Sequence, residues 1–543
     1  MEQNKGRNVE RKYVDAVVIG AGFGGLYMVH KLRNEQGLTV QGYDKGSDVG
    51  GTWYWNRYPG ALSDTESYLY RYSFDKELLQ EWSWKESYLT QPEILDYLGH
   101  VADRYDLRRS FQFDTKVNST HFDEVNNLWE VKTDKGDVVT AKYLITGLGL
   151  LSATNIPNFK GRETFTGEQY HTAAWPKSGV DLKGKRVGVI GTGSTGVQVI
   201  TAIAPEVGHL TVFQRTPQYS VPSGKRPQSE EEINEIKANF AKIWEQAKNS
   251  SVAYGVDESN VPANSVSIEE QNRIFQKAWD KGNGFRFMFE TFGDIGTNIE
   301  ANEAAASFIR KKISEIVKDS KTARKLTPTD LYARRPLCDS GYYQTYNRDN
   351  VSLVDVKENP IVEITPKGIR TTEGEYELDV IIYATGFDAV DGNYTKIDMR
   401  GRGGVSMREK WLDGPTGYLG MSNTDFPNLF MILGPNGPFS NLPPAIETQV
   451  EWIAETVKHM VENNIETIEP TQVAEEDWVE TCRNIANQTL FAKTESWIFG
   501  ANIPGKKHAV MFYMGGLNAY RNLLGEIGYS GFVFDRAKMS SLK

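Results

Sequence analysis

Two glycine-rich stretches have the spacing GxGxxG, and each could hold a pyrophosphate. Their glycines are Gly20, Gly22 and Gly25 in the first stretch, and Gly191, Gly193 and Gly196 in the second. Glycine lets the backbone turn tightly and approach a phosphate with no Cβ in the way, and the helix that follows offers free N–H groups and the positive end of its dipole. One such motif alone is weak evidence. Here each lies between a strand-like and a helix-like run, which favours a nucleotide loop over a glycine turn without a ligand.

The residues that end the following strands separate the two ligands. Asp44 ends the run LTVQGYD and Arg215 ends the run LTVFQR, each 24 residues after the first glycine of its motif, from 20 to 44 and from 191 to 215. A carboxylate accepts hydrogen bonds from free ribose hydroxyls, which favours FAD at the first loop. A guanidinium pairs with a 2′-phosphate, which favours NADP(H) over NAD(H) at the second loop, where Thr216 could add a donor.

The elements around these loops predict an α/β fold with two Rossmann-like dinucleotide-binding domains. In the first βαβ unit, the helix after the loop carries apolar Leu26, Val29 and Leu32 on one side. The apolar runs LITGLGLLS at 144–152 and IIYATGFD at 381–388 both end in small residues, where the chain could cross between domains. We expect residues 1–149 and 390–543 to form a discontinuous FAD-binding domain, and residues 150–389 to form the NADP-binding domain.

A helical insertion is expected at residues 224–332 within the NADP-binding domain. Ser229 and Glu232 form a capping box, which predicts the start of a helix. Its apolar residues follow helical spacing, and they are Ile233, Ile236, Phe240, Ile243 and Trp244. A second predicted helix carries Phe308, Ile309, Ile313, Ile316 and Val317. Such stripes favour core packing over ligand contacts.

Composition excludes several other classes of protein. No run of 18 apolar residues is present in the 543 residues, so we expect no membrane span, and a net charge of −10 disfavours nucleic acid as a partner. Cys338 and Cys482 are the only cysteines, which excludes a CxxC motif and leaves redox chemistry to a bound cofactor; we expect no metal site. Residues 1–15 have no apolar core that would indicate a secretion signal. We therefore expect a cytoplasmic monomer that acts on a small molecule.

Two further stretches carry a resemblance to a known family. FTGEQYHTAAWP, between the two loops, matches the fingerprint FxGxxxHxxxW of type I Baeyer-Villiger monooxygenases, followed by Pro, at Phe165, Gly167, His171, Trp175 and Pro176. GGTWYWNRYPGALSD is similar to the second signature of that family, at Gly50, Gly51, Trp53, Tyr58, Pro59, Gly60 and Asp64. The resemblance covers essentially the whole chain and is closest to the cyclohexanone monooxygenases. It implies that His171 organises the geometry of the two domains; a buried His bonded to the backbone is the simpler alternative.

The resemblance also implies a reaction. An enzyme of this family uses FAD and NADPH to insert one oxygen atom of O2 next to the carbonyl of a ketone, here expected to be cyclic, and releases a lactone or ester. Arg335 in LYARRPLCDSGYY matches the catalytic arginine of the family, which stabilises a flavin C4a-peroxide together with bound NADP+. Asp64 matches its acidic partner, although an ordinary ion pair remains the alternative. Arg334 departs from the usual Lys and keeps the positive charge for the 2′-phosphate.

The expected ligand contacts follow from the motifs and the resemblance together. For FAD they are Gly20, Gly22, Phe23, Gly25, Asp44, Lys45, Gly51, Thr52, Trp53, Asp64 and Tyr70. For NADP they are Gly191, Thr192, Gly193, Ser194, Thr195, Gly196, Gln198, Arg215, Thr216, Arg334 and Trp497. For the ketone they are the apolar residues Leu150, Phe439, Leu442, Trp497 and Phe512. Trp497 lies in SWIFGANIPGKK, whose Gly and Pro residues indicate a mobile lid.

The same scaffold is compatible with other functions. An N- or S-oxygenating flavin monooxygenase shares the two loops but lacks the Trp-Pro end of the fingerprint. A thiol or disulfide reductase would need a CxxC motif, which this sequence does not contain. Non-enzymatic sensing of NADPH is a third alternative.

Overall fold

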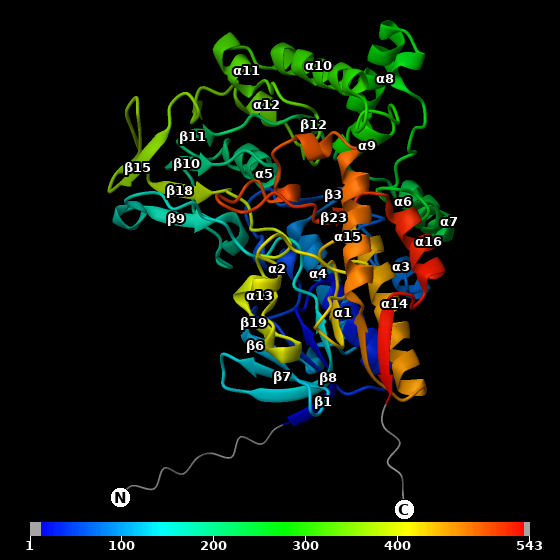
Figure 1. Ribbon diagram of the computed structural model, residues 1–543. Helices are drawn as coiled ribbons and strands as arrows, with labels where there is room; N and C mark the ends of the chain where they lie inside the picture. Colours follow the sequence, from blue (N-terminus) through cyan, green and yellow to red (C-terminus); the bar gives the residue numbers. More distant parts are fainter. Residues whose placement is uncertain (1–11, 537–543) are drawn as a thin grey trace, which may run out of the picture.

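Two sheets organise the computed structural model, which describes residues 12–536 (Figure 1). The larger sheet has eight strands in the order β19-β6-β7-β8-β1-β2-β5, with β20 also paired to β8. Its strands are β1 (Lys12–Ile19), β2 (Val40–Tyr43), β5 (Phe111–Gln112), β6 (Val117–Asp123), β7 (Leu128–Thr133), β8 (Val138–Thr146), β19 (Asp398–Arg400) and β20 (Leu429–Met431). The smaller sheet is parallel throughout, in the order β14-β11-β10-β18-β9. Its strands are β9 (Glu168–His171), β10 (Arg186–Ile190), β11 (His209–Gln214), β14 (Val351–Asp355) and β18 (Val380–Tyr383).

Each predicted loop joins a central strand to a helix. β1 leads through the first glycine motif into α1 (Phe23–Val29) and then to β2, which runs parallel to β1. β10 leads through the second motif into α5 (Ser194–Ile203) and then to the parallel strand β11. Asp44 and Arg215 directly follow β2 and β11, as the sequence predicts. The α/β fold with two Rossmann-like units is therefore confirmed.

Smaller strand groups and further helices surround the two sheets. The strand groups are β3 (Leu62–Glu66) with β4 (Tyr88–Thr90), β12 (Ser220–Pro222) with β13 (Leu337–Asp339), β15 (Ile361–Thr365) with β16 (Gly368–Thr371) and β17 (Glu375–Glu377), β21 (Gly437–Pro438) with β23 (Phe512–Tyr513), and β22 (Ile465–Pro470) with β24 (Phe532–Arg536). The helices are α2 (Thr52–Trp55), α3 (Lys76–Glu81), α4 (Gln91–Arg104), α12 (Tyr342–Thr345), α13 (Met407–Lys410), α14 (Leu442–Glu462), α15 (Gln472–Asn487) and α16 (Leu517–Ile527).

The helical insertion is present, but its first helix is shorter than the apolar pattern predicts. The capping box of Ser229 and Glu232 is confirmed at the start of α6 (Glu230–Ala238), yet the chain leaves the helix at Asn239 and restarts as α7 (Phe240–Lys248). Asn239 has φ −107° and ψ 9°, and its Nδ2 donates to the carbonyl of Glu235 at 2.8 Å. The backbone N–H of Asn239 donates to the same carbonyl at 3.2 Å, so the side chain reinforces the end of α6, and the non-helical dihedral angles of Asn239 divide one expected helix into two.

The insertion packs on two different cores. Apolar side chains of α6 and α7, such as Ile233 and Trp244, join the core beside the large sheet. Its later helices are α8 (Ile268–Lys281), α9 (Gly284–Phe289), α10 (Ile299–Ile316) and α11 (Ser320–Leu326). Phe308, Ile309 and Ile313 of α10 are buried in the core beside the small sheet, so the prediction that this stripe is core is confirmed. Figure 1 shows α8, α10 and α11 together, apart from α6 and α7.

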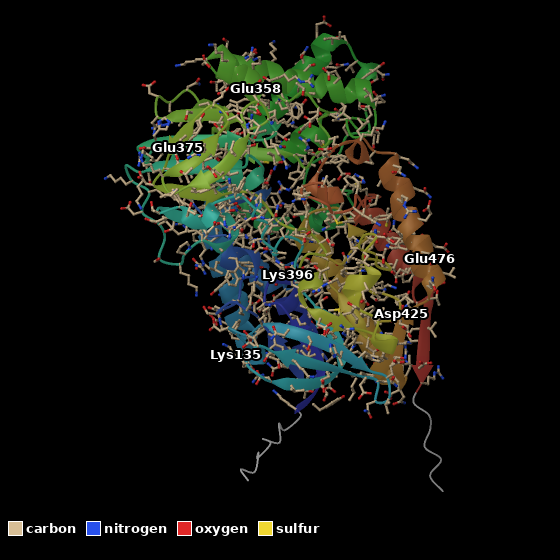
Figure 2. The ribbon with its side chains drawn as sticks, turned by 60° about the vertical axis from the view of Figure 1, so that its left-hand side comes forward. Lys135, Glu358, Glu375, Lys396, Asp425 and Glu476 are labelled. Carbon is tan, nitrogen blue, oxygen red and sulfur yellow. The ribbon has the colours of Figure 1, made fainter. Side chains whose placement is uncertain are left out.

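Charged side chains of both signs cover the outside, among them Lys135, Glu358 and Glu476 (Figure 2). Within residues 12–536, no helix has the length and apolar character that crossing a bilayer requires. The same range holds no group of three or more His, Cys, Asp or Glu side chains able to bind a metal ion. The expectation that the N-terminus carries no secretion signal falls mainly on residues 1–11, which lie outside the described residues.

Candidate active site

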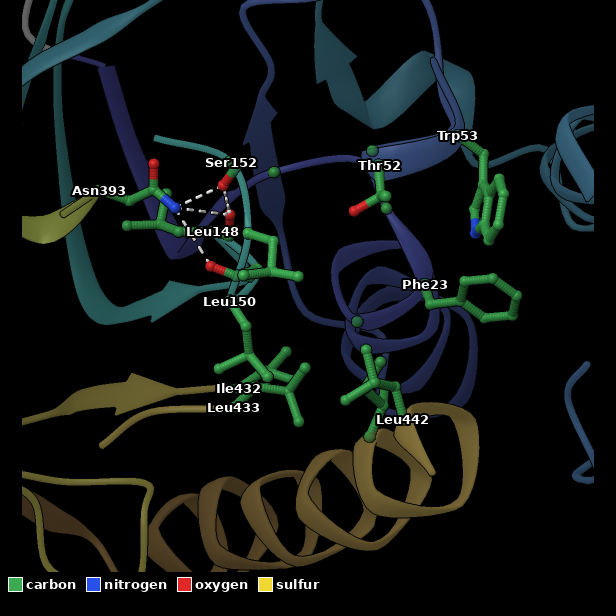
Figure 3. A pocket seen from close by; sticks show the side chains of 18 of the residues that line it. Phe23, Thr52, Trp53, Leu148, Leu150, Ser152, Asn393, Ile432, Leu433 and Leu442 are labelled. Carbon is green, nitrogen blue, oxygen red and sulfur yellow. Dashed lines mark hydrogen bonds between the residues drawn. The ribbon is translucent and has the colours of Figure 1, made fainter. Parts of the chain in front are cut away.

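A cavity lies at the carboxyl ends of β1, β2 and β8 (Figure 3). Ile19, Tyr43 and Gly147, at the ends of these strands, all line it. Parallel strands place their carboxyl ends along one edge of a sheet, and ligands of open α/β sheets bind outside that edge. Across the cavity, α14 contributes Leu442 and the segment after β20 contributes Ile432. The position is that of a dinucleotide site.

Most of the predicted FAD contacts meet in this cavity. Those that line it are Gly20, Gly22, Phe23, Asp44, Lys45, Gly51, Thr52, Trp53 and Tyr70. Gly25 does not line it; a Cβ there would lie 1.7 Å from the carbonyl oxygen of Gly20, so its role is to let α1 pack against the loop. Asp64 does not line the cavity either, but it forms an ion pair with Arg335, which does line the cavity.

Two loops approach each other closely at the place expected for a pyrophosphate. A Cβ on Gly51 would lie 2.8 Å from the Cα of Gly22, and Gly51 has φ +53°. Both glycines line the cavity beside the start of α1, whose first N–H groups have no partner within a helix. The absence of side chains at Gly22 and Gly51 leaves room for a phosphate group beside the start of α1, since any side chain there would fill the space between the two loops.

The Asp44 carboxylate lies at the edge of the same cavity. Its Oδ2 accepts the N–H of Ala21 at 2.7 Å and its Oδ1 accepts the N–H of Gly46 at 2.6 Å. Burial raises the pKa of Asp44, and these two hydrogen bonds oppose the rise. A carboxylate has about four acceptor positions, so the two that remain fit the hydroxyls of a ribose.

An ion pair between Arg335 and Asp64 lies where the cavity meets the helical insertion. Arg335 Nη1 is 2.8 Å from Asp64 Oδ2, and the Phe285 ring centroid is 5.3 Å from the guanidinium carbon. Burial disfavours the charge on Arg335, but the Asp64 carboxylate outweighs that effect and the pKa of Arg335 is raised. Burial raises the pKa of Asp64 while Arg335 opposes the rise. The guanidinium therefore stays charged beside the cavity.

One oxygen of this pair has no bond in the described part of the chain. Asp64 Oδ1 is buried and finds no hydrogen-bond partner among residues 12–536. Buried carboxylate oxygens without partners are uncommon. Asp64 does not line the cavity itself, so it acts on the cavity through Arg335, its ion-pair partner.

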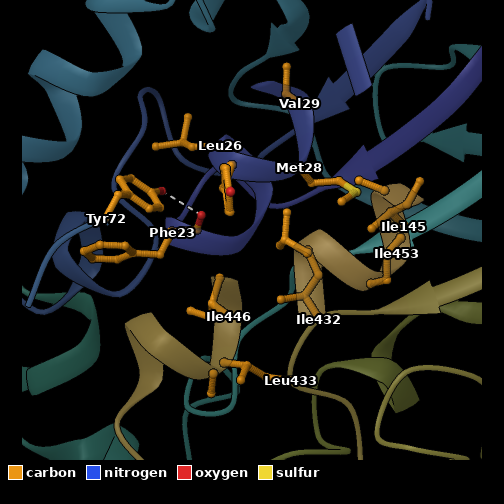
Figure 4. Close-up of a cluster of buried hydrophobic side chains, with 14 of the residues drawn as sticks. Phe23, Leu26, Met28, Val29, Tyr72, Ile145, Ile432, Leu433, Ile446 and Ile453 are labelled. Carbon is orange, nitrogen blue, oxygen red and sulfur yellow. Dashed lines mark hydrogen bonds between the residues drawn. The ribbon is translucent and has the colours of Figure 1, made fainter. Parts of the chain in front are cut away.

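The predicted apolar contacts of the ketone also line this cavity. They are Leu150, Phe439, Leu442, Trp497 and Phe512. The rings of Phe439 and Phe512 meet edge to face at 5.3 Å, and those of Trp497 and Phe512 at 6.1 Å. Phe23, Ile432 and Ile446 also line the cavity, and they belong to the core around α1 (Figure 4). One cavity thus joins a nucleotide loop, a fixed positive charge and an apolar wall.

Some lining residues were missed by the sequence analysis. They are Val252, Tyr254, Phe285, Phe289 and Asn393. Tyr254 stacks on Phe285 with ring centroids 3.7 Å apart. Asn393 Nδ2 donates to the carbonyl of Gly149 at 3.1 Å and to Ser152 Oγ, which fixes the loop after β8 (Figure 3). Val252 and Tyr254 lie in an irregular part of the insertion, and Phe285 and Phe289 lie in the short helix α9, so no long periodic pattern marks the side chains that turn inward.

The second glycine loop lies outside this cavity, between β10 and α5. Gly191, Thr192, Gly193, Ser194, Thr195 and Gly196 form the turn and the first helical residues. A Cβ on Gly193 would have open space around it, whereas one on Gly196 would lie 2.3 Å from the carbonyl oxygen of Gly191. Arg215 is exposed after β11, and within residues 12–536 no hydrogen bond or ion pair is found for its side chain. Thr216 lies beside it and accepts a hydrogen bond from Thr192 Oγ1 at 3.1 Å.

Three of the predicted NADP contacts lie elsewhere or have other partners. Gln198 accepts the hydroxyl of Tyr58 at 2.7 Å and donates to the carbonyl of Leu62 at 3.0 Å, so it ties α5 to the segment that leads to Asp64. Arg334 pairs with Asp330 at 2.5 Å and donates to the carbonyl of Glu495 at 3.0 Å. Trp497 lines the first cavity and is not part of the second glycine loop.

The fingerprint begins just before β9, the edge strand of the small sheet, and continues beyond it. His171 pairs with Tyr383 of β18 and is 6% exposed. Its Nδ1 accepts the N–H of Ala173 at 3.1 Å, and burial lowers the pKa of His171, which favours a neutral ring. Phe165 and Trp175 are buried, and a Cβ on Gly167 would lie 2.4 Å from the carbonyl oxygen of Asp379.

Pro176 directly precedes a contact between the two units. Lys177 Nζ, the next residue, donates to Ser47 Oγ at 2.5 Å, in the loop after β2. Its Nζ also lies 4.7 Å from the ring centroid of Tyr54. The fingerprint therefore links the small sheet to the loop that borders the first cavity.

Comparison with known proteins agrees with this geometry. The family described as pyridine nucleotide-disulphide oxidoreductase matches residues 17–278. A Baeyer-Villiger monooxygenase of Pseudooceanicola batsensis is 65% identical over 96% of both chains, and a cyclohexanone 1,2-monooxygenase of an Acinetobacter species is 59% identical over 95% of this chain and 96% of its own. A phenazine N-monooxygenase of Lysobacter antibioticus is 52% identical over 96% of this chain and 97% of its own.

The solved structures agree as well. Cyclohexanone monooxygenase of Rhodococcus sp. Phi1, a crystal structure bound to NADP+, is 63% identical with a TM-score of 0.96, over 97% of this chain and all of that one. The similarity to these relatives covers nearly the full length of the chain. The chain therefore belongs to the Baeyer-Villiger monooxygenases, NADPH-dependent flavoprotein enzymes.

Proposed function

We propose that this chain inserts one oxygen atom of O2 next to the carbonyl of a cyclic ketone and releases a lactone or ester. The observation that carries the proposal is the Arg335–Asp64 pair, with 2.8 Å between Nη1 and Oδ2, at a cavity that also holds the first glycine loop and an apolar wall. FAD in this cavity and NADPH at the second glycine loop are the cofactors. The glycine approach at Gly22 and Gly51 and the open acceptor positions of Asp44 support the place of FAD.

The bound flavin supplies the redox chemistry, since it accepts hydride from NADPH and activates O2. Arg335 supplies the charge: its guanidinium, aimed into the cavity before the reaction begins, stabilises negative charge on oxygen without rearrangement. Loss of one such donor in other enzymes costs about 3–4 kcal/mol. Asp64 holds the guanidinium in place, because a carboxylate and a guanidinium form a strong, directional pair.

The apolar wall has two roles in this proposal. Phe439, Leu442 and Phe512 bind a ring by burial, which contributes about 25 cal/mol per Å² of apolar surface removed from water. They also keep water away from the charged oxygen, which prevents its protonation and loss as hydrogen peroxide. Trp497 lies at this wall within the Gly- and Pro-rich segment, and we propose that this segment closes over the cavity.

At the second loop, Arg215 selects the cofactor. It is exposed after β11, and the described part of the chain offers it no anionic partner, so it is open to a 2′-phosphate. Arg334 adds a second positive charge at the 2′-phosphate when its guanidinium leaves the ion pair with Asp330 and binds the phosphate instead. We propose the domain limits given above, 1–149 with 390–543 and 150–389, on the ground that β19 and β20 rejoin the large sheet. His171 is proposed to organise the junction of the two.

Oxygen transfer from labelled O2 tests the proposal. The purified holoenzyme is given NADPH, 18O2 and a panel of cyclic, linear and aryl ketones, and products are measured by gas chromatography with mass spectrometry. One 18O atom in the lactone or ester, and faster NADPH oxidation with ketone than without, is the expected result. Equal NADPH oxidation in both cases, with hydrogen peroxide as the sole product, would refute it.

N-oxygenation is the second candidate, because one relative at 52% identity is a phenazine N-monooxygenase. The apolar, aromatic wall could hold a flat heterocycle as well as a ketone ring. Adding phenazine to the same panel separates the two functions. An N-oxide formed with no lactone from any ketone would favour this candidate.

A further inference from the structure

One buried carboxamide connects the Asp64 segment to the helical insertion. Asn283 precedes α9, is 1% exposed and has φ +79°, a backbone conformation that Asn tolerates better than most residues. Its Oδ1 accepts the N–H of Phe285 at 2.8 Å and that of Arg286 at 3.3 Å. The side chain therefore caps α9.

The amino group of the same carboxamide points to the catalytic pair. Asn283 Nδ2 donates to the carbonyl oxygen of Asp64 at 3.2 Å and to the hydroxyl of Tyr88 at 3.0 Å. An Asn side chain has two acceptor positions and two donor hydrogens, and all four are used here. A fully bonded, buried amide has one orientation, so it fixes the groups around it.

The first residues of α9 contact the segments that carry Arg335 and Asp64. The N–H of Gly284 donates to Cys338 Sγ at 3.2 Å, three residues after Arg335 in the chain. The Phe285 ring lies 5.3 Å from the guanidinium carbon of Arg335. Arg286 Nη2 is 2.8 Å from Glu66 Oε1, two residues after Asp64. Thus α9 contacts both the strand that carries Asp64 and the segment that carries Arg335.

We propose that Asn283 is a positioning residue for oxygen insertion. Its amide holds the Asp64 backbone at a fixed place relative to α9, so that the Arg335 guanidinium is kept between the Asp64 carboxylate and the Phe285 ring. This inference rests on the proposed function of Arg335 and Asp64. Asn283 itself does not line the cavity.

The variant Asn283→Asp separates the two halves of the amide. Asp keeps an acceptor for the N–H groups of α9 and loses the donor to the Asp64 carbonyl. The matched control is Asn298→Asp, because Asn298 Oδ1 caps α10 in the same way, accepting the N–H of Glu300 at 2.8 Å and that of Ala301 at 3.1 Å. FAD content, the anaerobic rate of flavin reduction by NADPH, the lactone formed per NADPH oxidised and a crystal structure are measured for each.

We expect Asn283→Asp to bind FAD and to be reduced at the wild-type rate, with an unchanged KM for NADPH. The lactone formed per NADPH should fall about tenfold or more, since displacing a positioned group by about 1 Å can cost up to a hundredfold. Its crystal structure should show Arg335 Nη1 farther than 2.8 Å from Asp64 Oδ2. Asn298→Asp should match the wild type in every measurement.

Wild-type lactone yield in Asn283→Asp, with the ion pair intact, would overturn the inference. If that variant fails to bind FAD, Asn283→Gly decides, since Gly accepts the left-handed backbone and removes the donor without adding charge; a wild-type yield there overturns it equally. Arg335→Ala is run beside them. A normal lactone yield from Arg335→Ala refutes the proposed function itself. If Arg335→Ala makes no lactone while Asn283→Asp gives the wild-type yield, only the role of Asn283 is refuted.

Discussion

Replacing Asp64 with Asn keeps the shape of the side chain and removes its charge. The carboxylate lies 2.8 Å from Arg335 Nη1, and the Asp64 side chain is 4% exposed. The Asn carboxamide still accepts a hydrogen bond from the charged guanidinium, so only the attraction between the two charges is lost. Hydrogen bonds to charged groups contribute about 1.5–3 kcal/mol. A loss of about 1.4 kcal/mol, the spread of that range, corresponds to a tenfold weaker hold on the guanidinium.

The assay follows the fate of NADPH in the holoenzyme of Asp64→Asn. NADPH oxidation is read by absorbance, lactone by gas chromatography and hydrogen peroxide by a coupled peroxidase reaction, with cyclohexanone as substrate. We expect the lactone formed per NADPH to fall about tenfold and hydrogen peroxide to replace it, at an unchanged rate of flavin reduction.

Asp379→Asn is the control for this prediction. Asp379 forms an ion pair with Arg186 at the same 2.8 Å, but both side chains are more than 40% exposed and neither lines the described cavity. Exposed pairs contribute little, so this variant should keep the wild-type yield. A wild-type yield in Asp64→Asn as well would refute the reasoning that the buried carboxylate holds Arg335 for the reaction.

Three further predictions test other parts of the site. Burial raises the pKa of Asp64 above the ordinary Asp value of about 3.9, so acidification protonates Asp64 at a higher pH than it protonates an exposed Asp. A raised pKa means that the protonated carboxyl favours the folded state; this contribution to stability is fully present below about pH 3.9 and is lost as the pH rises through the raised pKa. The same protonation removes the negative charge that holds Arg335. Lactone yield should therefore decline on acidification at a pH above 3.9 in the wild type but not in Asp64→Asn, and identical profiles would contradict this. Arg215→Glu should raise the KM for NADPH about tenfold to a hundredfold, because it replaces a charged bond to the 2′-phosphate with repulsion, and should leave the KM for NADH nearly unchanged; equal effects in steady-state kinetics would count against the 2′-phosphate contact. Gly51→Ala should purify with little FAD, measured by the ratio of flavin to protein absorbance, because its Cβ would lie 2.8 Å from the Cα of Gly22. Gly37→Ala is its control, since Gly37 also has a positive φ, +72°, but no atom lies within 4 Å of its Cβ position, and equal FAD loss in both would show that strain alone is responsible.

The parts of the fold that the sequence predicts are those set by local rules. A nucleotide loop needs its glycines within a few residues of a strand and a helix, and Asp44 and Arg215 follow their strands because a βαβ unit has a nearly fixed length. The same local rule placed the capping box at Ser229. It could not predict the break at Asn239, where one side-chain hydrogen bond competes with an apolar pattern that continues across it.

The contacts that complete the site are long-range, and no local pattern announces them. Tyr254 and Phe285 belong to the insertion and line the cavity, but they lie outside the two apolar stripes that the sequence marks there. Asn283 meets Asp64 only because the insertion folds back over β3. Gln198 was expected at the nucleotide, and its side chain bonds Tyr58 and Leu62, a pairing that depends on how the two sheets approach each other.

Arg335→Ala tests the central claim most directly. In the proposed function the guanidinium is the fixed positive charge that oxygen insertion requires, and hydride transfer does not depend on it. In the holoenzyme of this variant, mixed with NADPH, O2 and cyclohexanone, the account predicts flavin reduction at the wild-type rate with lactone lost and hydrogen peroxide formed in its place. Lactone at the wild-type yield would contradict the account.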